Sequence, residues 1–429
     1  MIQHCPVLIV LPPLTAALLC LLFSKFNKNL GSWLVIGSIA GALACSLQVL
    51  HQTLTSGEAI HYWMGNWEPP LGIEFVIDPL SAVMAVLITF ISLMVAVYSK
   101  PFMRKEDWLH IGGYYTLYGL LTVGLCGMVI TGDMFNLYVY LEVMSLSGYG
   151  LIAMGGKKSM LAAFRYMLIG TIGASLYLIS VAYLYAMTGT LNMADLGERI
   201  MPYLSSPPFA LAVACLFIGF GIKIALFPLH GWQPDAYNFA HPGSAAFIAG
   251  VMSKVPAYAI IRFFFYIFGV NNPIISTALT VLGILGIGGV LIGSIMALAQ
   301  YDFRRMLAYS SVAQIGYIAI GLAIGNMYGF IGAVLHIINH AFMKSALFLV
   351  IGGIQYRFGE INLYRLGGLN NKMTLSTITV ILAALSMVGI PPTAGFFSKW
   401  YLMLGAYQGG QYFYIVVLVI SSLLNAERL

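Results

Sequence analysis

The stretch MYGFIGAVLHIINHAFMKSALFLVIGGI, residues 327–354, decides the fold class of this chain. It is longer than the about 20 apolar residues that a helix needs to cross the hydrocarbon of a bilayer. Within it, His336, His340 and Lys344 recur every fourth residue, which places them on one face of a helix. A barrel strand would be short and would alternate apolar with polar residues. The stretch therefore predicts a membrane helix that carries ionisable groups.

The rest of the chain has the same apolar character. Of its 429 residues, 60% are hydrophobic and 8% are charged, against about 25% charged in soluble domains. A soluble fold of this length would lack the core volume to hide so much apolar surface. Inside a bilayer the backbone amides must be satisfied within the protein, which long apolar segments achieve as helices. The composition therefore predicts an all-α integral membrane protein.

Thirteen apolar segments predict about 13 transmembrane helices. They cover residues 5–24, 31–50, 75–98, 111–130, 133–153, 160–187, 208–229, 243–269, 273–298, 306–324, 327–354, 374–407 and 411–425. The first lacks the basic region and cleavage site of a signal peptide, so we take it as a helix. The seventh contains Lys223 and Pro228, and the twelfth contains Pro391 and Pro392. Because proline removes a backbone donor and clashes with the preceding turn, both helices are expected to be broken.

Charged residues in the predicted loops indicate the orientation. The loops assigned to one side hold most of the basic residues: Lys25, Lys28, Lys100, Arg104, Lys105, Lys157, Lys158, Arg304, Arg305, Arg357, Arg365, Lys372 and Arg428. The opposite loops hold Arg199 beside five acids: Glu58, Glu68, Glu74, Asp195 and Glu198. Because basic loops remain in the cytoplasm, the N-terminus is predicted to lie outside. We expect the membrane to be a prokaryotic cytoplasmic (inner) membrane.

Several ionisable residues fall inside the predicted helices, where an ionised side chain costs about 2.5–3.5 kcal/mol at the bilayer centre. They are Glu142, Arg165, Lys223, Lys254, Arg262, His336, His340, Lys344 and Lys399. Arg165 and Arg262 lie near helix ends, and their favoured interpretation is snorkelling to the headgroups. Asp78 and Asp133 are predicted to cap the helices that follow them. The nine in-helix residues without the two arginines are the candidates for ion translocation. An alternative role for Glu142, as a structural counter-ion of one lysine, stays open.

The spacing of the two histidines favours proton transfer over metal binding. Their run is HIINH, which lacks the glutamate of a zinc-binding HExxH helix and precedes a lysine. An imidazole can accept a proton on one nitrogen and release one from the other near neutral pH. The five cysteines lie in apolar segments without a CxxC spacing and read as buried apolar residues. No disulfide framework and no Fe–S or zinc site is predicted.

The two broken helices lie five helices apart, and each carries a lysine. Transporters with inverted repeats place broken helices at corresponding positions of their two halves. This predicts two inverted five-helix repeats, helices 4–8 and 9–13. The expected regions are 1–110, a three-helix region, 111–269, the first repeat, and 270–425, the second repeat.

At this point the residues match a known family. The passages are GDMFNLYVYLEVMSLSGYGLIA (132–153), KIALFPLHGWQPDAYNFAHPGSAAFIAGVMSKVPAYAIIRF (223–263), YDFRRMLAYSSVAQIGY (301–317), LHIINHAFMKSALFL (335–349) and GIPPTAGFFSKW (389–400). The chain resembles the antiporter-like subunits shared by respiratory complex I, Mrp-type sodium/proton antiporters and energy-converting membrane hydrogenases. The resemblance implies about fourteen helices, two inverted five-helix repeats and no bound cofactor in this subunit.

The resemblance also implies roles by position. Glu142 looks like the acid of helix 5 that partners Lys223 in broken helix 7, and Lys254 looks like the link to the second half. His336, His340 and Lys344 look like a central relay, and Lys399 looks like the lysine of the second half-channel. His230 and Asp235 also match motif positions and are secondary candidates. The chain stops at Leu429, where relatives continue into another helix, so its C-terminus is expected to be shortened relative to the family.

These features predict an ion-translocating subunit of a multisubunit membrane complex. The passages favour a monovalent cation/proton antiporter D-type subunit, not catalytic by itself, with other membrane subunits, protons and Na⁺ or K⁺ as partners. The alternative is a proton-pumping subunit of a complex I-like NADH:quinone oxidoreductase or an energy-converting hydrogenase. A solitary carrier of a small solute and a purely structural scaffold are the hypotheses from other classes. Nucleic acid is not among the expected partners.

Overall fold

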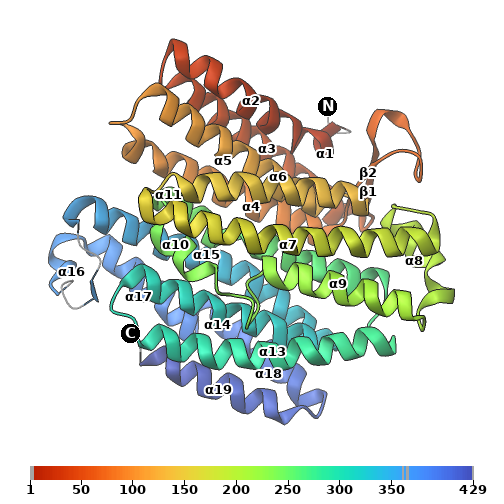
Figure 1. The fold of residues 1–429 in the computed structure, drawn as a ribbon. Helices are drawn as coiled ribbons and strands as arrows, with labels where there is room; N and C mark the ends of the chain where they lie inside the picture. The colour runs from red at the N-terminus through yellow and green to blue at the C-terminus, as the bar shows by residue number, and fades with distance from the viewer. Residues whose placement is uncertain (1–3, 360–361, 364–366, 428–429) are drawn as a thin grey trace. The chain divides into compact units, whose positions relative to one another are not determined.

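The computed structural model describes residues 4–359, 362–363 and 367–427, and most of them are helical (Figure 1). Arg365, Arg428 and Leu429, named above, lie outside these residues. The chain forms two compact units by its internal contacts. The first unit comprises Met1–Phe220 with Tyr258–Gly269, and the second comprises Gly221–Ala257 with Val270–Leu429.

The first unit is built from helices that pack side by side, as α2, α3 and α5 do (Figure 1). Its helices are α1 (Cys5–Leu8), α2 (Leu11–Phe26), α3 (Leu30–Ser56), α4 (Pro79–Met103), α5 (Trp108–Ile130), α6 (Met134–Ala153), α7 (Lys157–Thr188), α8 (Met193–Arg199), η2 (Met64–Asn66) and η3 (Met201–Tyr203), with most of α9 (Pro207–Lys223). The Tyr118 hydroxyl donates to the Ser92 carbonyl at 2.7 Å, and the Ser92 and Thr122 hydroxyls lie 2.7 Å apart. Such bonds satisfy polar groups between helices in an apolar solvent.

A short hairpin precedes α4 and was not predicted. β1 (Ile60–Trp63) pairs antiparallel with β2 (Glu74–Ile77). The helix predicted over 75–98 is therefore wrong at its beginning, because residues 75–77 belong to β2. Asp78 ends the strand and caps α4, since its carboxylate accepts from Ser81 N at 2.8 Å while Asp78 N donates to Ser81 Oγ at 2.8 Å. Asp133 caps α6 in the same way, through Asn136 N at 2.6 Å, so both predicted caps are confirmed.

The second unit contains α10 (Gln233–Phe239), α11 (Pro242–Phe247), α13 (Pro273–Leu298), α14 (Phe303–Ala323), α15 (Met327–Phe358), α16 (Leu369–Lys372), α17 (Thr374–Val388), α18 (Ala394–Gln408) and α19 (Tyr412–Ala426). α13 runs beside α14 (Figure 1). Their backbones approach closely, because a Cβ on Gly316 would lie 2.6 Å from the Gly286 carbonyl oxygen. Small residues permit this approach between membrane helices.

Both predicted helix breaks are present. α9 ends at Lys223, and turns lead to α10, with Ala225 at φ +59°. α17 ends at Val388, and α18 begins at Ala394, with Gly389 at φ +86° between them. A left-handed residue stops the helix in each case, and the prolines that follow cannot restart its hydrogen bonding at once.

The helix predicted over 243–269 is less regular than its sequence indicates. After α11, the π-helical segment η4 (Ile248–Met252) precedes α12 (Lys254–Ile261), and a second π-helical segment, η5 (Arg262–Ile267), follows. Neither π-helical segment was predicted from the sequence. π-helical turns are rare within helices and are frequent at functional sites.

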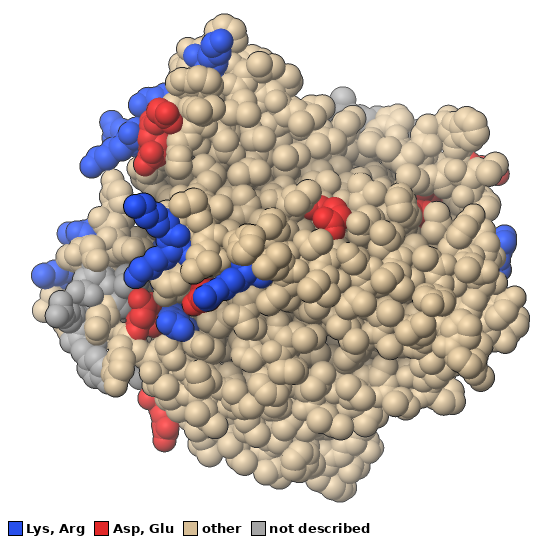
Figure 2. All heavy atoms as spheres, viewed as in Figure 1, with Lys and Arg blue, Asp and Glu red and all other residues tan. Residues whose placement is uncertain are grey.

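The composition of the helices supports a membrane protein. In the part of the chain that the structure describes, nine helices are long and apolar enough to cross a membrane, and α9, α17 and α19 are shorter apolar helices. Figure 2 shows that most of the visible surface carries neither acidic nor basic side chains. The chain is thus an integral membrane protein, while the count of thirteen spans and the inverted repeats stay predictions.

Candidate proton-translocation site

The second unit holds a set of buried basic side chains. Lys223, Lys254, His336, His340, Lys344 and Lys399 are each at most 4% exposed, so their predicted burial is confirmed. Glu142 lies within α6 of the first unit, inside an apolar helix as predicted, and its side chain is partly exposed. Its pairing with Lys223, which ends α9, stays a prediction.

Lys399 is held by the end of a broken helix. Its Nζ donates to the carbonyl oxygens of Met387 at 2.9 Å and Val388 at 3.0 Å, the last two residues of α17, and to Ser422 Oγ at 3.0 Å. The last carbonyls of a helix lack internal partners and carry the negative end of its dipole. The break at Gly389 therefore provides the lysine with a ready set of neutral acceptors.

Lys254 is held by an irregular turn of its own helix. Its Nζ donates to the carbonyl oxygen of Ala249, which lies within η4. In a π-helical turn the hydrogen bonds shift from the fourth to the fifth residue, which frees a carbonyl from the regular ladder. The π-helical turn therefore provides the carbonyl oxygen that binds the Lys254 amine.

Lys344 takes its acceptors from a neighbouring helix. It lies on the uninterrupted α15, and its Nζ donates to Leu307 O at 2.9 Å and to Ser310 Oγ at 2.6 Å, both on α14. The acceptors in these particular hydrogen bonds of Lys254, Lys344 and Lys399 are uncharged oxygens. An amine bonded in this way can lose its proton without leaving a buried carboxylate unpaired.

The histidines lie between aromatic and hydroxyl groups. His336 Nδ1 lies 3.0 Å from Ser398 Oγ, and the His336 and His340 ring centroids are 6.2 Å apart. Tyr317 lies beside both His336 and Lys399, with its ring centroid 5.2 Å from the imidazole and 4.6 Å from Lys399 Nζ. His336 Nε2 and both ring nitrogens of His340 have no hydrogen-bond partner among the described residues, so transfer between the two rings would need an intervening water.

Tyr317 is the residue that the sequence reasoning missed. Its hydroxyl donates to Ser421 Oγ at 2.6 Å and accepts from Asn425 Nδ2 at 3.3 Å. It carries no charge, so a search for ionisable residues within apolar segments passes over it. The signal in the sequence was its place at the end of YDFRRMLAYSSVAQIGY, residues 301–317.

The secondary candidates occupy the segment after α9. The His230 ring stacks on Phe227 at a centroid distance of 5.5 Å. Asp235 Oδ1 lies 3.9 Å from Arg305 Nη2, and both side chains are partly exposed. Exposed pairs of this kind contribute little to stability, and Asp235 ranks below the buried residues.

Arg262 does not snorkel, and that interpretation is wrong. Its guanidinium donates to both Asp78 carboxylate oxygens at 2.5 Å and to the Tyr258 hydroxyl at 2.6 Å. Burial raises the pKa of Asp78, but the hydrogen bonds and charge of Arg262, with the Ser81 cap, outweigh it and leave the pKa lowered. Asp78 thus both caps α4 and neutralises an arginine. Arg165, by contrast, is exposed on α7.

The match to known families follows this arrangement. Residues 131–425 match the model described as NADH:quinone oxidoreductase/Mrp antiporter, TM, and residues 63–110 match that of NADH-Ubiquinone oxidoreductase (complex I), chain 5 N-terminus. The chain belongs to the NADH:quinone oxidoreductase/Mrp antiporter family. All seven candidate residues of this family member lie within residues 131–425.

Relatives of this antiporter-family chain come from two kinds of assembly. It is 46% identical over 426 residues to the N-type subunit of NADH-quinone oxidoreductase from Desulforudis audaxviator, covering 99% of this chain and 85% of that protein. It is 32% identical over 425 residues to the D-type subunit of the Na⁺/H⁺ antiporter from Alkalihalophilus pseudofirmus, covering 97% and 84%.

Two solved structures resemble its fold. A chain of the membrane-bound sulfane sulfur reductase, an archaeal respiratory membrane complex, matches with a TM-score of 0.93 at 28% identity, over 98% of this chain and 85% of that chain. A chain of the Mrp complex from Dietzia matches with a TM-score of 0.89 at 29% identity, over 99% and 78%.

Proposed function

We propose that this chain is an ion-translocating subunit of a multisubunit membrane complex, and that protons move along its buried lysines and histidines. The observation that carries the proposal is the set Lys254, His336, His340, Lys344 and Lys399, all buried within one unit. Glu142 and Lys223 are proposed to extend the path. Other membrane subunits are the proposed partners, as the assemblies of the related proteins suggest.

Neutral acceptors suit such a path. A carboxylate partner strongly favours the charged form of a buried lysine, whereas carbonyl and hydroxyl oxygens favour the ammonium less and can also accept a hydrogen bond from the neutral amine. Charging one lysine then discourages the charging of its neighbours, because like charges repel strongly where little water screens them. A proton is therefore passed on when the next group becomes able to accept it.

The type of parent complex has two candidates. The first is a monovalent cation/proton antiporter, in which this chain is the D-type subunit, as the relative from Alkalihalophilus pseudofirmus supports. The second is a redox-driven proton pump, supported by the 46% identity to the N-type subunit of an NADH-quinone oxidoreductase. We further propose a prokaryotic cytoplasmic membrane with the N-terminus outside, and inverted repeats over 111–269 and 270–425.

One assay tests the function and separates these candidates. Vesicles that carry the whole complex are given either a sodium or potassium gradient or NADH with a quinone, and a fluorescent probe follows ΔpH. Lys399→Ala and Glu142→Gln are expected to abolish the signal, while Lys372→Ala, a change in an exposed lysine, keeps it. A ΔpH driven by a cation gradient supports the antiporter, and one driven by NADH supports the pump. Undiminished transport in both site variants rejects the path.

A further inference from the structure

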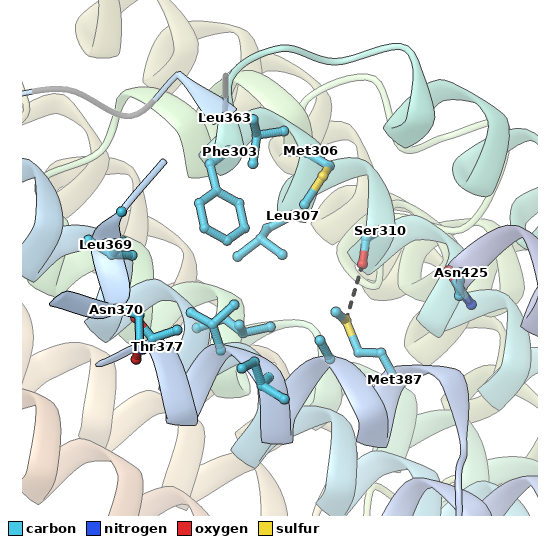
Figure 3. Close-up of a pocket in the computed structure, with 15 residues that line it drawn as sticks. Phe303, Met306, Leu307, Ser310, Leu363, Leu369, Asn370, Thr377, Met387 and Asn425 are labelled. Carbon is cyan, nitrogen blue, oxygen red and sulfur yellow. Dashed lines mark hydrogen bonds between the residues drawn. The ribbon is translucent and has the colours of Figure 1, made fainter. Parts of the chain in front are cut away.

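A cavity lies within the second unit, beside Lys344. It has a volume of about 370 Å³, and α14, α17 and α19 contribute to its lining. Its outer part includes Asn370 and Ile381, which are exposed, and its inner part includes Leu307 and Ser310, which are buried. Figure 3 shows Ser310 and Met387 facing one another at one side, with Leu369, Asn370 and Thr377 at the other. We call this cavity the Ser310 pocket.

The inner side of the pocket contacts Lys344. Ser310 Oγ lines the pocket and accepts a hydrogen bond from Lys344 Nζ at 2.6 Å, and it donates to Met387 Sδ at 3.6 Å. Leu307, the second acceptor of Lys344, also lines the pocket. One hydroxyl group therefore separates the interior of the pocket from a buried lysine of the proposed path.

The same pocket reaches the surroundings of Lys399. Met387 lines it and provides the carbonyl oxygen that accepts from Lys399 Nζ at 2.9 Å. Asn425 lines it too and donates to the hydroxyl of Tyr317, whose ring lies against Lys399. Lys344 on α15 and Lys399 on α18 each donate a hydrogen bond to a residue that lines the pocket.

Water suits this pocket better than an acyl chain. A water molecule takes about 30 Å³ in the liquid, so the volume holds on the order of ten. Most of the lining side chains are apolar, and Ser310, Asn370, Thr377 and Asn425 are the polar ones that can bind water. An acyl chain would place hydrocarbon against these groups and beside a cationic lysine, which costs free energy.

We propose that the Ser310 pocket is a water-filled vestibule through which protons reach Lys344 by way of the Ser310 hydroxyl. In uptake, an O–H bond of hydronium breaks and an O–H bond forms on Ser310. The proton that Ser310 already carried forms the new N–H bond on a neutral Lys344 amine, and water remains in the pocket. The vestibule opens beside α16, which contributes Leu369 and Asn370 to the lining and ends at Lys372. This inference rests on the proposed function.

Thiol labelling tests whether the pocket holds water. Ala384→Cys introduces a thiol at a buried lining position of α17, and Leu382→Cys introduces one on the same helix at a position that is 57% exposed and apolar. A charged, membrane-impermeant methanethiosulfonate reacts with thiolates, which form in water and not in hydrocarbon. The complex in vesicles is labelled from each side, with wild type setting the background of the five native cysteines and Lys372→Cys marking its own side.

The expected result is labelling of Ala384→Cys from the Lys372 side at a rate at least about tenfold above that of Leu382→Cys. Equal slow rates in the two variants mean that hydrocarbon or packed side chains fill the pocket, and they overturn the proposal. Labelling from the opposite side alone overturns it as well. Because labelling needs no transport, a reactive Ala384→Cys in an inactive complex rejects only the proposed function, and an unreactive one in an active complex rejects only the vestibule.

Substitution of the hydroxyl tests the last step. Ser310→Ala is expected to lower the rate of proton transport about tenfold while Ala384→Cys in the same chain stays reactive, as removal of one charge-assisted hydrogen bond predicts. Ser311→Ala is the control, since Ser311 is buried on the same helix and its hydroxyl bonds to Leu307 O within α14. Equal transport by the Ser310→Ala and Ser311→Ala variants would remove Ser310 from the path.

Discussion

The first unit and the second unit bind a cationic side chain with different partners, a carboxylate in the first and uncharged oxygens in the second. In the first, Arg262 meets Asp78 through two hydrogen bonds of 2.5 Å, and the pair is charged on both sides. In the second, Lys399 meets two carbonyl oxygens and a hydroxyl. Arginine in an ion pair does not lose its proton, whereas a lysine among neutral acceptors can. We propose that the first arrangement fixes structure and that the second serves proton exchange.

The largest effect is expected where the ion pair is broken. Arg262→Ala leaves the Asp78 carboxylate partly buried without its partner and should lower the free energy of unfolding by about 3–5 kcal/mol. Thermal denaturation of the purified complex measures this, with Arg165→Ala, an exposed arginine of α7, as the control. Addition of Asp78→Ala should recover part of the loss. The structural role of the pair would be contradicted if Arg262→Ala left the free energy of unfolding unchanged, or if Arg165→Ala lowered it by the same amount.

The next effect separates holding a charge from exchanging it. Lys399→Arg keeps a cation near the end of α17 but removes its ability to deprotonate. We expect proton transport to fall about 10²-fold or more, the contribution of a proton-transfer group, while assembly remains normal. ΔpH formation per assembled complex is the measurement, and Lys372→Arg is the matched control. If Lys399→Arg transports protons at the wild-type rate, Lys399 only stabilises α17.

The break itself should be sensitive to a single methyl group. Gly389 has φ +86°, and a Cβ there would lie 2.9 Å from Lys399 Cδ. Gly389→Ala should cost about 1–2 kcal/mol in backbone strain and displace Lys399, so transport should fall about tenfold. Gly353→Ala on α15, where the nearest atom lies 4.0 Å away, should leave both quantities close to wild type. Normal transport with a lowered melting temperature would show that Lys399 tolerates displacement.

The smallest effect is confined to acid pH and to the first unit. Because the folded pKa of Asp78 lies below its ordinary value, its contribution to stability is present above about pH 4 and is lost as the pH falls through the folded pKa. Wild type should therefore lose stability in that acid window more steeply than Asp78→Asn. Denaturation of both proteins from pH 6 downward measures the slopes, and parallel curves would assign the acid sensitivity to other groups.

Much of this arrangement could be predicted from residue types along the chain. Pro228 and the pair Pro391–Pro392 predict the breaks at α9 and α17 because proline cannot continue a helix. Asp78 and Asp133 predict caps because their carboxylates satisfy free amides at a helix start. The buried lysines stand out because charge is rare among apolar residues. Each of these signals is local and needs no knowledge of neighbouring helices.

The sequence by itself determined an apolar helical chain, where its helices break and which ionisable residues lie inside them. The tertiary structure alone decided that Arg262 pairs with Asp78, 184 residues away along the chain, and that Lys344 bonds to Ser310 on another helix. It also produced the π-helical turn that holds Lys254 and the cavity beside Ser310. Hydrophobic pattern and proline act within a few residues, whereas partners and cavities depend on which helices pack together.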